Sequence, residues 1–206
     1  MQFDHLFIVG CPRSGTTALG NMFAQHPKVM MGIERYGHRA FPSDFSLSPE
    51  LFEYERFIDF RTSDTFYDGP AFAPAAYSGM EQKFRNARWV GDKIPTLFRT
   101  LPKLFDSFPV EARVLFIFRN IFDVAASYKA RKNNDSDNWS KGVPDAIADW
   151  TDAIRSFRTS HHQDKIIPII YEDLFSDERQ AVELFRQLGL EVDPAFANVI
   201  KPKFDS

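Results

Sequence analysis

A run of glycine, serine, threonine and arginine near the start of the chain has the residue types of an anion-binding loop. The run reads Gly10-Cys11-Pro12-Arg13-Ser14-Gly15-Thr16-Thr17. The spacing of its glycines and hydroxyl residues is close to that of the nucleotide-phosphate loop, G-x-x-x-x-G-K-[ST]. The backbone N–H groups of such a loop, and the positive end of a helix that follows it, attract phosphate. We therefore predict an anion site at 10–17. The alternative is an ordinary turn with a buried arginine.

The residue at position 16 separates this loop from those of kinases and ATPases. Those loops need a lysine where this chain has Thr16, and here the cation is Arg13, inside the loop. Kinase-type loops also work with Mg²⁺, held by an acid at the end of a neighbouring strand. The apolar run 114–118 ends instead in Arg119. Because a cation there repels a metal and attracts phosphate, we predict a site without metal. A nucleotide kinase or NTPase-like protein stays the alternative.

A second group of residues could bind another phosphate. Ser127 follows Arg119 by eight residues, and Arg131 follows Ser127 by four. On one helix Ser127 and Arg131 are neighbours, and Arg119 precedes the helix N-terminus. Such a group can hold one dianion through charge-assisted hydrogen bonds. The alternative is a set of surface arginines paired with Asp123 or Asp135.

The composition excludes several other classes of protein. A length of 206 residues suits one domain. A net charge of -3 argues against a nucleic-acid binder, and one cysteine excludes a disulfide framework or a cysteine-rich zinc site. No apolar run approaches the roughly 20 residues that span a bilayer. Because a strand-like run begins at once, leaving no room for a signal peptide, we expect a cytoplasmic protein.

Short apolar runs alternate with segments of helical spacing along the chain. We predict strands at 6–9, 29–32, 89–91, 114–118 and 166–170. We predict helices at 15–25, 49–59, 78–87, 96–108, 121–132, 145–159 and 176–188, and a mobile loop at 132–144. This alternation indicates βαβ units and a mostly parallel sheet, with ligands beyond the carboxyl ends of its strands. The stretch 40–88 is rich in phenylalanine and is expected to be an insertion, partly core and partly the wall of an acceptor cleft.

These motifs resemble those of sulfotransferases that use 3′-phosphoadenosine 5′-phosphosulfate (PAPS), most closely the protein-tyrosine and carbohydrate branch. The loop at 12–17 is similar to their 5′-phosphosulfate loop, and Arg119 through Ser127 is similar to their 3′-phosphate motif. The resemblance implies a three-layer α/β/α fold with a five-stranded parallel sheet in the order 2-3-1-4-5. It implies that residues 1–206 form one sulfotransferase domain with the insertion at 40–88.

The resemblance also implies roles for single residues. His26-Pro27-Lys28-Val29-Met30-Met31-Gly32-Ile33-Glu34 matches the segment that ends in the catalytic base, and Gly91-Asp92-Lys93-Ile94-Pro95 matches the segment that carries a catalytic lysine. Glu34 is thus the expected base, with His38 in reserve, while Lys93 and Arg13 neutralise the charge on the oxygen that leaves sulfur. The residues expected to bind the cofactor are Pro12, Arg13, Ser14, Gly15, Thr16, Thr17, Arg119, Ser127, Arg131 and Tyr171, the last of them near the adenine.

The implied reaction moves a sulfuryl group from PAPS to a hydroxyl, or less readily an amine. The acceptor is a small molecule, a carbohydrate or a peptide, and the other product is 3′-phosphoadenosine 5′-phosphate (PAP). No metal and no nucleic acid take part. A non-catalytic nucleotide-binding protein stays open as a third interpretation.

Overall fold

A five-stranded parallel sheet forms the centre of the protein, as the computed structural model shows over residues 3–65, 79–109 and 112–200. Its strands lie in the order β2-β3-β1-β4-β5, which confirms the expected order. Each neighbouring pair is parallel, so the carboxyl ends of all strands meet at one edge. The strands are β1 (Asp4–Gly10), β2 (Val29–Ile33), β3 (Trp89–Lys93), β4 (Ala112–Phe118) and β5 (Ile166–Ile170).

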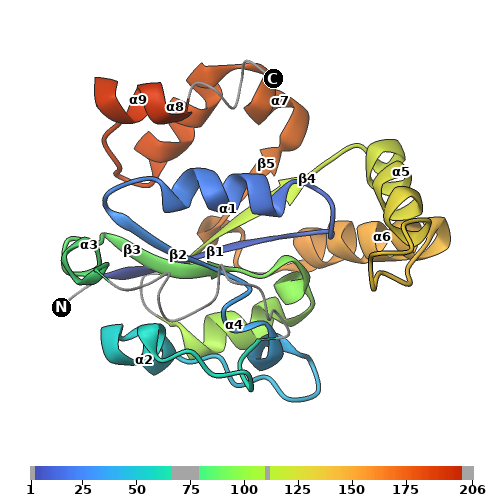
Figure 1. Ribbon diagram of the computed structural model, residues 1–206, viewed down its shortest axis with the longest axis horizontal. Coiled ribbons are helices and arrows are strands. Elements are labelled where there is room, and N and C mark those ends of the chain that lie inside the picture. The colour runs from blue at the N-terminus through green and yellow to red at the C-terminus, as the bar shows by residue number, and fades with distance from the viewer. Residues whose placement is uncertain (1–2, 66–78, 110–111, 201–206) are drawn as a thin grey trace.

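Helices cover both faces of this sheet (Figure 1). One face carries α1 (Thr16–Ala24), α7 (Tyr171–Ser176), α8 (Glu178–Gln187) and α9 (Pro194–Ile200). The opposite face carries α2 (Tyr54–Ile58) and α4 (Leu101–Ser107), and α5 (Ile121–Lys132) and α6 (Val143–Thr159) lie together beyond the strand ends. Every residue of β1 is buried because helices pack on both of its sides, which explains the apolar run at 6–9.

Several predicted helices are divided in the structure. The helix expected at 49–59 consists of a 3-10 helix (Pro49–Phe52) and α2, because Glu53 between them is extended. The helix expected at 96–108 begins as a 3-10 helix (Pro95–Thr100) and continues as α4. Pro102 lies in the first turn of α4, where its missing N–H costs nothing.

Other boundaries also differ from the sequence prediction. A short helix that the sequence does not predict, α7, precedes α8. The Asp177 carboxylate caps the start of α8, because it accepts a hydrogen bond from the N–H of Arg179 at 2.9 Å. Further short helices are α3 (Glu81–Arg85) and 3-10 turns at Gly37–Ala40 and Gln163–Lys165. The start of α6 at Val143 shortens the loop expected at 132–144.

The described part of the aromatic-rich insertion contributes mainly to the core. Phe52, Phe57 and Phe84 are buried, and Phe52 packs edge-on against Phe7 of β1 and Phe108. These rings cover the sheet face that α2 and α4 share. Residues 66–78 of the insertion, and the start of the helix expected at 78–87, lie outside the described residues.

Candidate active site

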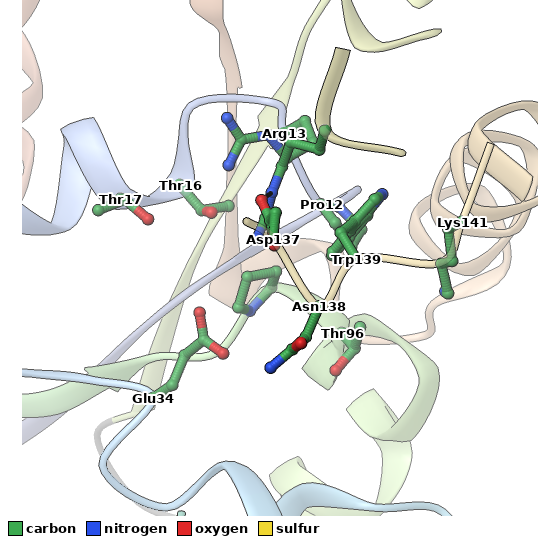
Figure 2. A pocket seen from close by; sticks show the side chains of 12 residues that line it. Pro12, Arg13, Thr16, Thr17, Glu34, Thr96, Asp137, Asn138, Trp139 and Lys141 are labelled. Carbon is green, nitrogen blue, oxygen red and sulfur yellow. Dashed lines mark hydrogen bonds and ion pairs between the residues drawn. The ribbon is translucent and has the colours of Figure 1, made fainter. Parts of the chain in front are cut away.

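A cavity of about 560 Å³ opens at the edge of the sheet where the strands end. The loop after β1, the turn after β2 and the segment after β3 all reach it, as the parallel topology predicts. Figure 2 shows Glu34 with its carboxylate directed toward the start of α1, where Thr16 and Thr17 lie. The cavity is lined by Pro12, Arg13, Thr16, Thr17, Glu34, Pro95, Thr96, Arg131, Asp137, Asn138, Trp139 and Lys141.

Two glycines give the loop between β1 and α1 its shape. A Cβ atom on Gly10 would lie 2.3 Å from the carbonyl oxygen of Ile117 in β4. A Cβ atom on Gly15, whose φ is +90°, would lie 2.3 Å from the ring of Tyr171. The loop therefore lies tightly against both neighbours. No side chain within the described residues caps the first turn of α1, so its leading N–H groups are open to an anion.

Arg13 connects the two predicted phosphate motifs. Its Nε donates to the Ser127 hydroxyl of α5 at 2.9 Å. Burial lowers the pKa of Arg13, and the positive charges of Arg131 and Arg119 lower it further. Three guanidinium groups thus gather around this loop. Their combined positive potential would attract a phosphorylated ligand.

Arg119 and Tyr171 lie on the side of the loop that faces β4 and β5. The Arg119 guanidinium carbon is 4.4 Å from the centre of the Tyr171 ring, and its Nε is 3.7 Å from the Asp123 carboxylate. Neither residue lines the cavity, and Ser127 does not either. Because β4 and β5 lie on the opposite side of β1 from β2 and β3, this pair is separated from Glu34 along the sheet edge.

The segment between α5 and α6 is anchored to the site. Asp137 accepts two hydrogen bonds from Arg131, at 2.5 and 2.6 Å, and the Trp139 ring lies 4.5 Å from the Arg131 guanidinium. Lys141 pairs with Asp149 of α6 at 2.7 Å. The sequence predicts only a mobile loop here, and the alternative to phosphate binding pairs the surface arginines with Asp123 or Asp135. Asp137 was missed, because its sole signal is a position six residues after Arg131 in a segment without periodicity.

Glu34 and Lys93 form an ion pair below the cavity. Lys93 Nζ lies 2.5 Å from Glu34 Oε1, and the side chains are 1% and 13% exposed. Lys93 therefore supports Glu34 from inside the protein, and Glu34 faces the cavity. The lysine stem passes over Gly20 of α1, where a Cβ atom would lie 3.2 Å from Lys93 Cβ.

The backbone of this site is unusual. Among the described residues, Arg13 and Glu34 are the non-glycine residues with positive φ, at 71° and 57°. Such conformations cost free energy and concentrate at functional sites. His38, the reserve base, lies away from the cavity lining and stacks on Phe41 at 6.0 Å.

Two further residues of the loop face the interior. The Ser14 side chain is fully buried, and its hydroxyl has no hydrogen-bond partner within the described chain. Burial raises the pKa of the Cys11 thiol to about 12, so this cysteine is a packing residue rather than a nucleophile.

Over the described ranges, no three His, Cys, Asp or Glu side chains are grouped to hold a metal. The helices described here are all too short or too polar to cross a bilayer.

Comparison with known proteins agrees with this architecture. A model of the sulfotransferase family matches residues 5–194. Nodulation protein NoeE of Sinorhizobium fredii is 32% identical over 135 residues, which cover 60% of this chain and 30% of NoeE. The match thus spans less than a third of that relative's length.

Solved structures share the fold at low identity. A sulfotransferase from Alicyclobacillus acidocaldarius is 18% identical, with a TM-score of 0.58 over 100% of this chain and 92% of its own. The sulfotransferase domain of the Synechococcus PCC 7002 olefin synthase is 20% identical, with a TM-score of 0.58 over 95% and 76%. Mouse sulfotransferase SULT7A1, solved with PAP, is 15% identical, with a TM-score of 0.57 over 100% and 65%.

Proposed function

Because the chain belongs to the sulfotransferase family, we propose that it works as one domain that transfers a sulfuryl group from PAPS to a hydroxyl acceptor. The observation that carries this proposal is the pair formed by Glu34 and Lys93 at the cavity that the phosphate loop borders. It puts a proton acceptor and a cation beside the place where a phosphosulfate would lie.

The donor is proposed from the distribution of cations. Arg13, the loop N–H groups, Thr16 and Thr17 would hold the 5′-phosphate, and Arg119 with Ser127 would hold the 3′-phosphate. The contact of Arg13 with Ser127 supports one ligand that spans both groups. Tyr171, next to Arg119, offers a ring near the same end of the nucleotide.

In the proposed reaction the acceptor oxygen forms a bond to sulfur while the bond from sulfur to the bridging oxygen breaks. Glu34 takes the acceptor proton. Lys93 and Arg13 neutralise the negative charge that grows on the bridging oxygen, which stays with PAP. As Glu34 gains the proton, its attraction for Lys93 falls. Lys93 is then released to the bridging oxygen at the moment when charge develops there.

An acceptor panel tests this function directly. Radiolabelled PAPS is incubated with the chain and with para-nitrophenol, simple sugars, tyrosine peptides or water, in the absence of metal. We expect label in at least one acceptor together with release of PAP. A parallel incubation replaces PAPS with radiolabelled ATP and Mg²⁺, and transfer in that incubation alone would favour the kinase interpretation instead. PAP binding without transfer to any acceptor would favour a non-catalytic nucleotide-binding protein.

Replacing Arg119 with alanine should remove the preference for a 3′-phosphate. A charge-assisted hydrogen bond contributes about 1.5–3 kcal/mol, which corresponds to a roughly 10- to 150-fold loss of PAP affinity. AMP lacks the 3′-phosphate, so its affinity should hardly change. Calorimetric titration with both nucleotides measures the difference. Arg113→Ala is a matched control, because Arg113 lies near the start of β4 and donates to the Asp164 carbonyl. Equal losses for PAP and AMP would contradict the assignment.

Replacing Asp137 with asparagine should strengthen PAP binding several-fold at low salt. The Arg131 guanidinium lowers the pKa of Asp137, so this carboxylate is charged at neutral pH. It occupies Arg131 and repels an incoming phosphate, and the asparagine removes that repulsion. Asp135→Asn, an exposed neighbour, is the control. Unchanged or weaker binding by Asp137→Asn would show that Arg131 takes no part in holding the nucleotide.

A further inference from the structure

Asp92 is a buried carboxylate beside Lys93 for which the proposed reaction has no direct use. Its Oδ1 accepts from the N–H of Arg35 at 3.1 Å, and its Oδ2 accepts from the N–H of Tyr36 at 2.8 Å. No lysine or arginine of the described ranges makes an ion pair with it. Both oxygens are therefore used to hold the backbone of the turn that follows Glu34.

Burying this carboxylate is costly. Burial raises the pKa of Asp92 to about 7, although the two N–H groups and the charge of Lys93 act in the other direction. An apolar or amide side chain would avoid this desolvation cost. A carboxylate, however, offers two acceptor oxygens on one short side chain, and an amide offers one. The two N–H groups of the turn need both oxygens.

Gly32 supplies the space that this contact needs. It lies opposite Asp92 in the pairing of β2 with β3. A Cβ atom at position 32 would lie 2.8 Å from Asp92 Oδ1 and 2.8 Å from Arg35 Cβ. The carboxylate reaches the turn only because position 32 has no side chain.

The turn itself is the strained one that carries Glu34. The N–H of Glu34 donates to the Lys93 carbonyl at 2.8 Å, and its own carbonyl accepts from the Thr65 hydroxyl at 2.6 Å. With a φ of 57°, Glu34 is in the left-handed region, which costs free energy relative to a relaxed backbone. The bonds of Asp92 to the next two N–H groups offset this cost. In this conformation the Glu34 carboxylate meets Lys93 Nζ.

Asp92 does not reach the reacting atoms. Successive side chains of a strand point to opposite faces, so Asp92 and Lys93 leave β3 in opposite directions. Lys93 lies against Gly20 of α1, and Asp92 lies against the turn at Arg35 and Tyr36. Any effect of Asp92 on the reaction must therefore pass through the turn and Glu34.

We propose that Asp92 is a positioning residue for sulfuryl transfer, which fixes the turn at 34–36 and so holds Glu34 against Lys93 at the cavity. The inference rests on the proposed function, because it assigns Asp92 a role through the base. It predicts a loss of turnover with nucleotide binding intact.

A double-mutant cycle tests the inference. The assay is PAP release from PAPS, with the acceptor of the panel above that the wild-type chain uses fastest. Asp92→Asn should lower kcat about 10- to 100-fold, the cost of misplacing a catalytic group by about 1 Å, with PAP affinity within about 2-fold of wild type. In the Glu34→Gln background, Asp92→Asn should lower the residual rate by less than about 2-fold. Equal reductions in both backgrounds would overturn the inference.

Two further variants keep the test decisive. Gly32→Ala keeps the Asp92 side chain but forces its carboxylate and Arg35 of the turn apart, so it should show the same coupling to Glu34 if Asp92→Asn does not fold. A wild-type rate in Gly32→Ala would overturn the inference. Asp4→Asn removes another buried carboxylate at the far end of the sheet, and its kcat should be unchanged. A comparable loss of kcat in Asp4→Asn would show that the loss in Asp92→Asn comes from general destabilisation of the protein.

The two hypotheses fail in different ways. If the wild-type chain releases no PAP with any acceptor, the proposed function fails and the inference with it. If Glu34→Gln retains full transfer, Glu34 is not the base and the inference fails, while sulfuryl transfer itself stands. If Glu34→Gln loses transfer while Asp92→Asn is harmless or fully additive, only the inference fails.

Discussion

Replacing Glu34 with glutamine should lower sulfuryl transfer by at least two orders of magnitude, while PAP binds nearly as in the wild-type chain. A hydroxyl acceptor must lose its proton as its oxygen bonds to sulfur. A positioned general base contributes about 10²–10⁴-fold to such a step. Glutamine keeps the shape of the side chain and cannot take the proton. The measurement is kcat for PAP release, together with a calorimetric Kd for PAP.

The structure indicates that Glu34→Gln removes the base without disturbing the turn or the contact with Lys93. Glu34 faces the cavity and contacts Lys93 Nζ, and the amide oxygen of glutamine can still accept from that lysine. The turn is held through backbone atoms of residues 34–36, so it does not depend on the carboxylate. Glu55→Gln, on the exposed side of α2, is the matched control and should leave kcat unchanged. Wild-type transfer by Glu34→Gln would move the base elsewhere, and His38→Gln would be the next variant to measure.

The sequence predicts the sheet and the tight loop at 10–17 because both are encoded locally. Buried parallel strands appear as unbroken apolar runs, so β4 was recognised from 114–118 with only its first two residues missing. The loop at 10–17 carries its own signal, two glycines flanking an arginine between a strand and a helix. The order of the strands came from the resemblance rather than from any local pattern.

The turn that carries Glu34 depends on contacts that no local pattern shows. Asp92 reaches Tyr36 across 56 positions of the chain, and Thr65 reaches Glu34 across 31. A glutamate in left-handed conformation has no propensity signal, because the surrounding structure imposes it. The sequence places position 32 at the end of a strand, and its close contact with Asp92 arises only when β2 and β3 pair.

The helix divisions were missed for a related reason. Apolar spacing continues through 49–59 and 96–108, since both pieces of each segment face the same core. The backbone nevertheless leaves the helical conformation at Glu53 and changes from 3-10 to α geometry at Thr100. The pairing of Arg131 with Asp137 is similar, because the chain must turn back after α5 before the two groups meet. Tertiary packing, rather than local propensity, determines where these helices divide and which residues pair.

Replacing Lys93 with methionine should lower kcat by about 10²–10³-fold and the affinity for PAPS only modestly. Removing one donor from a developing negative charge costs about that much, because the interaction is stronger in the transition state than in the ground state. Methionine preserves the stem that passes over Gly20, so packing of α1 on β3 should persist.

Lys83→Met is the control: Lys83 is a half-buried lysine of α3 that donates to the Ala24 carbonyl at 2.5 Å, away from the cavity lining. The measurements are single-turnover transfer rates and the Kd for PAPS in the absence of acceptor. If transfer and affinity fell by the same factor in Lys93→Met, the lysine would bind the nucleotide equally in both states and would not be catalytic. The expected split between them would place Lys93 at the bridging oxygen, where charge develops only as the bond to sulfur breaks.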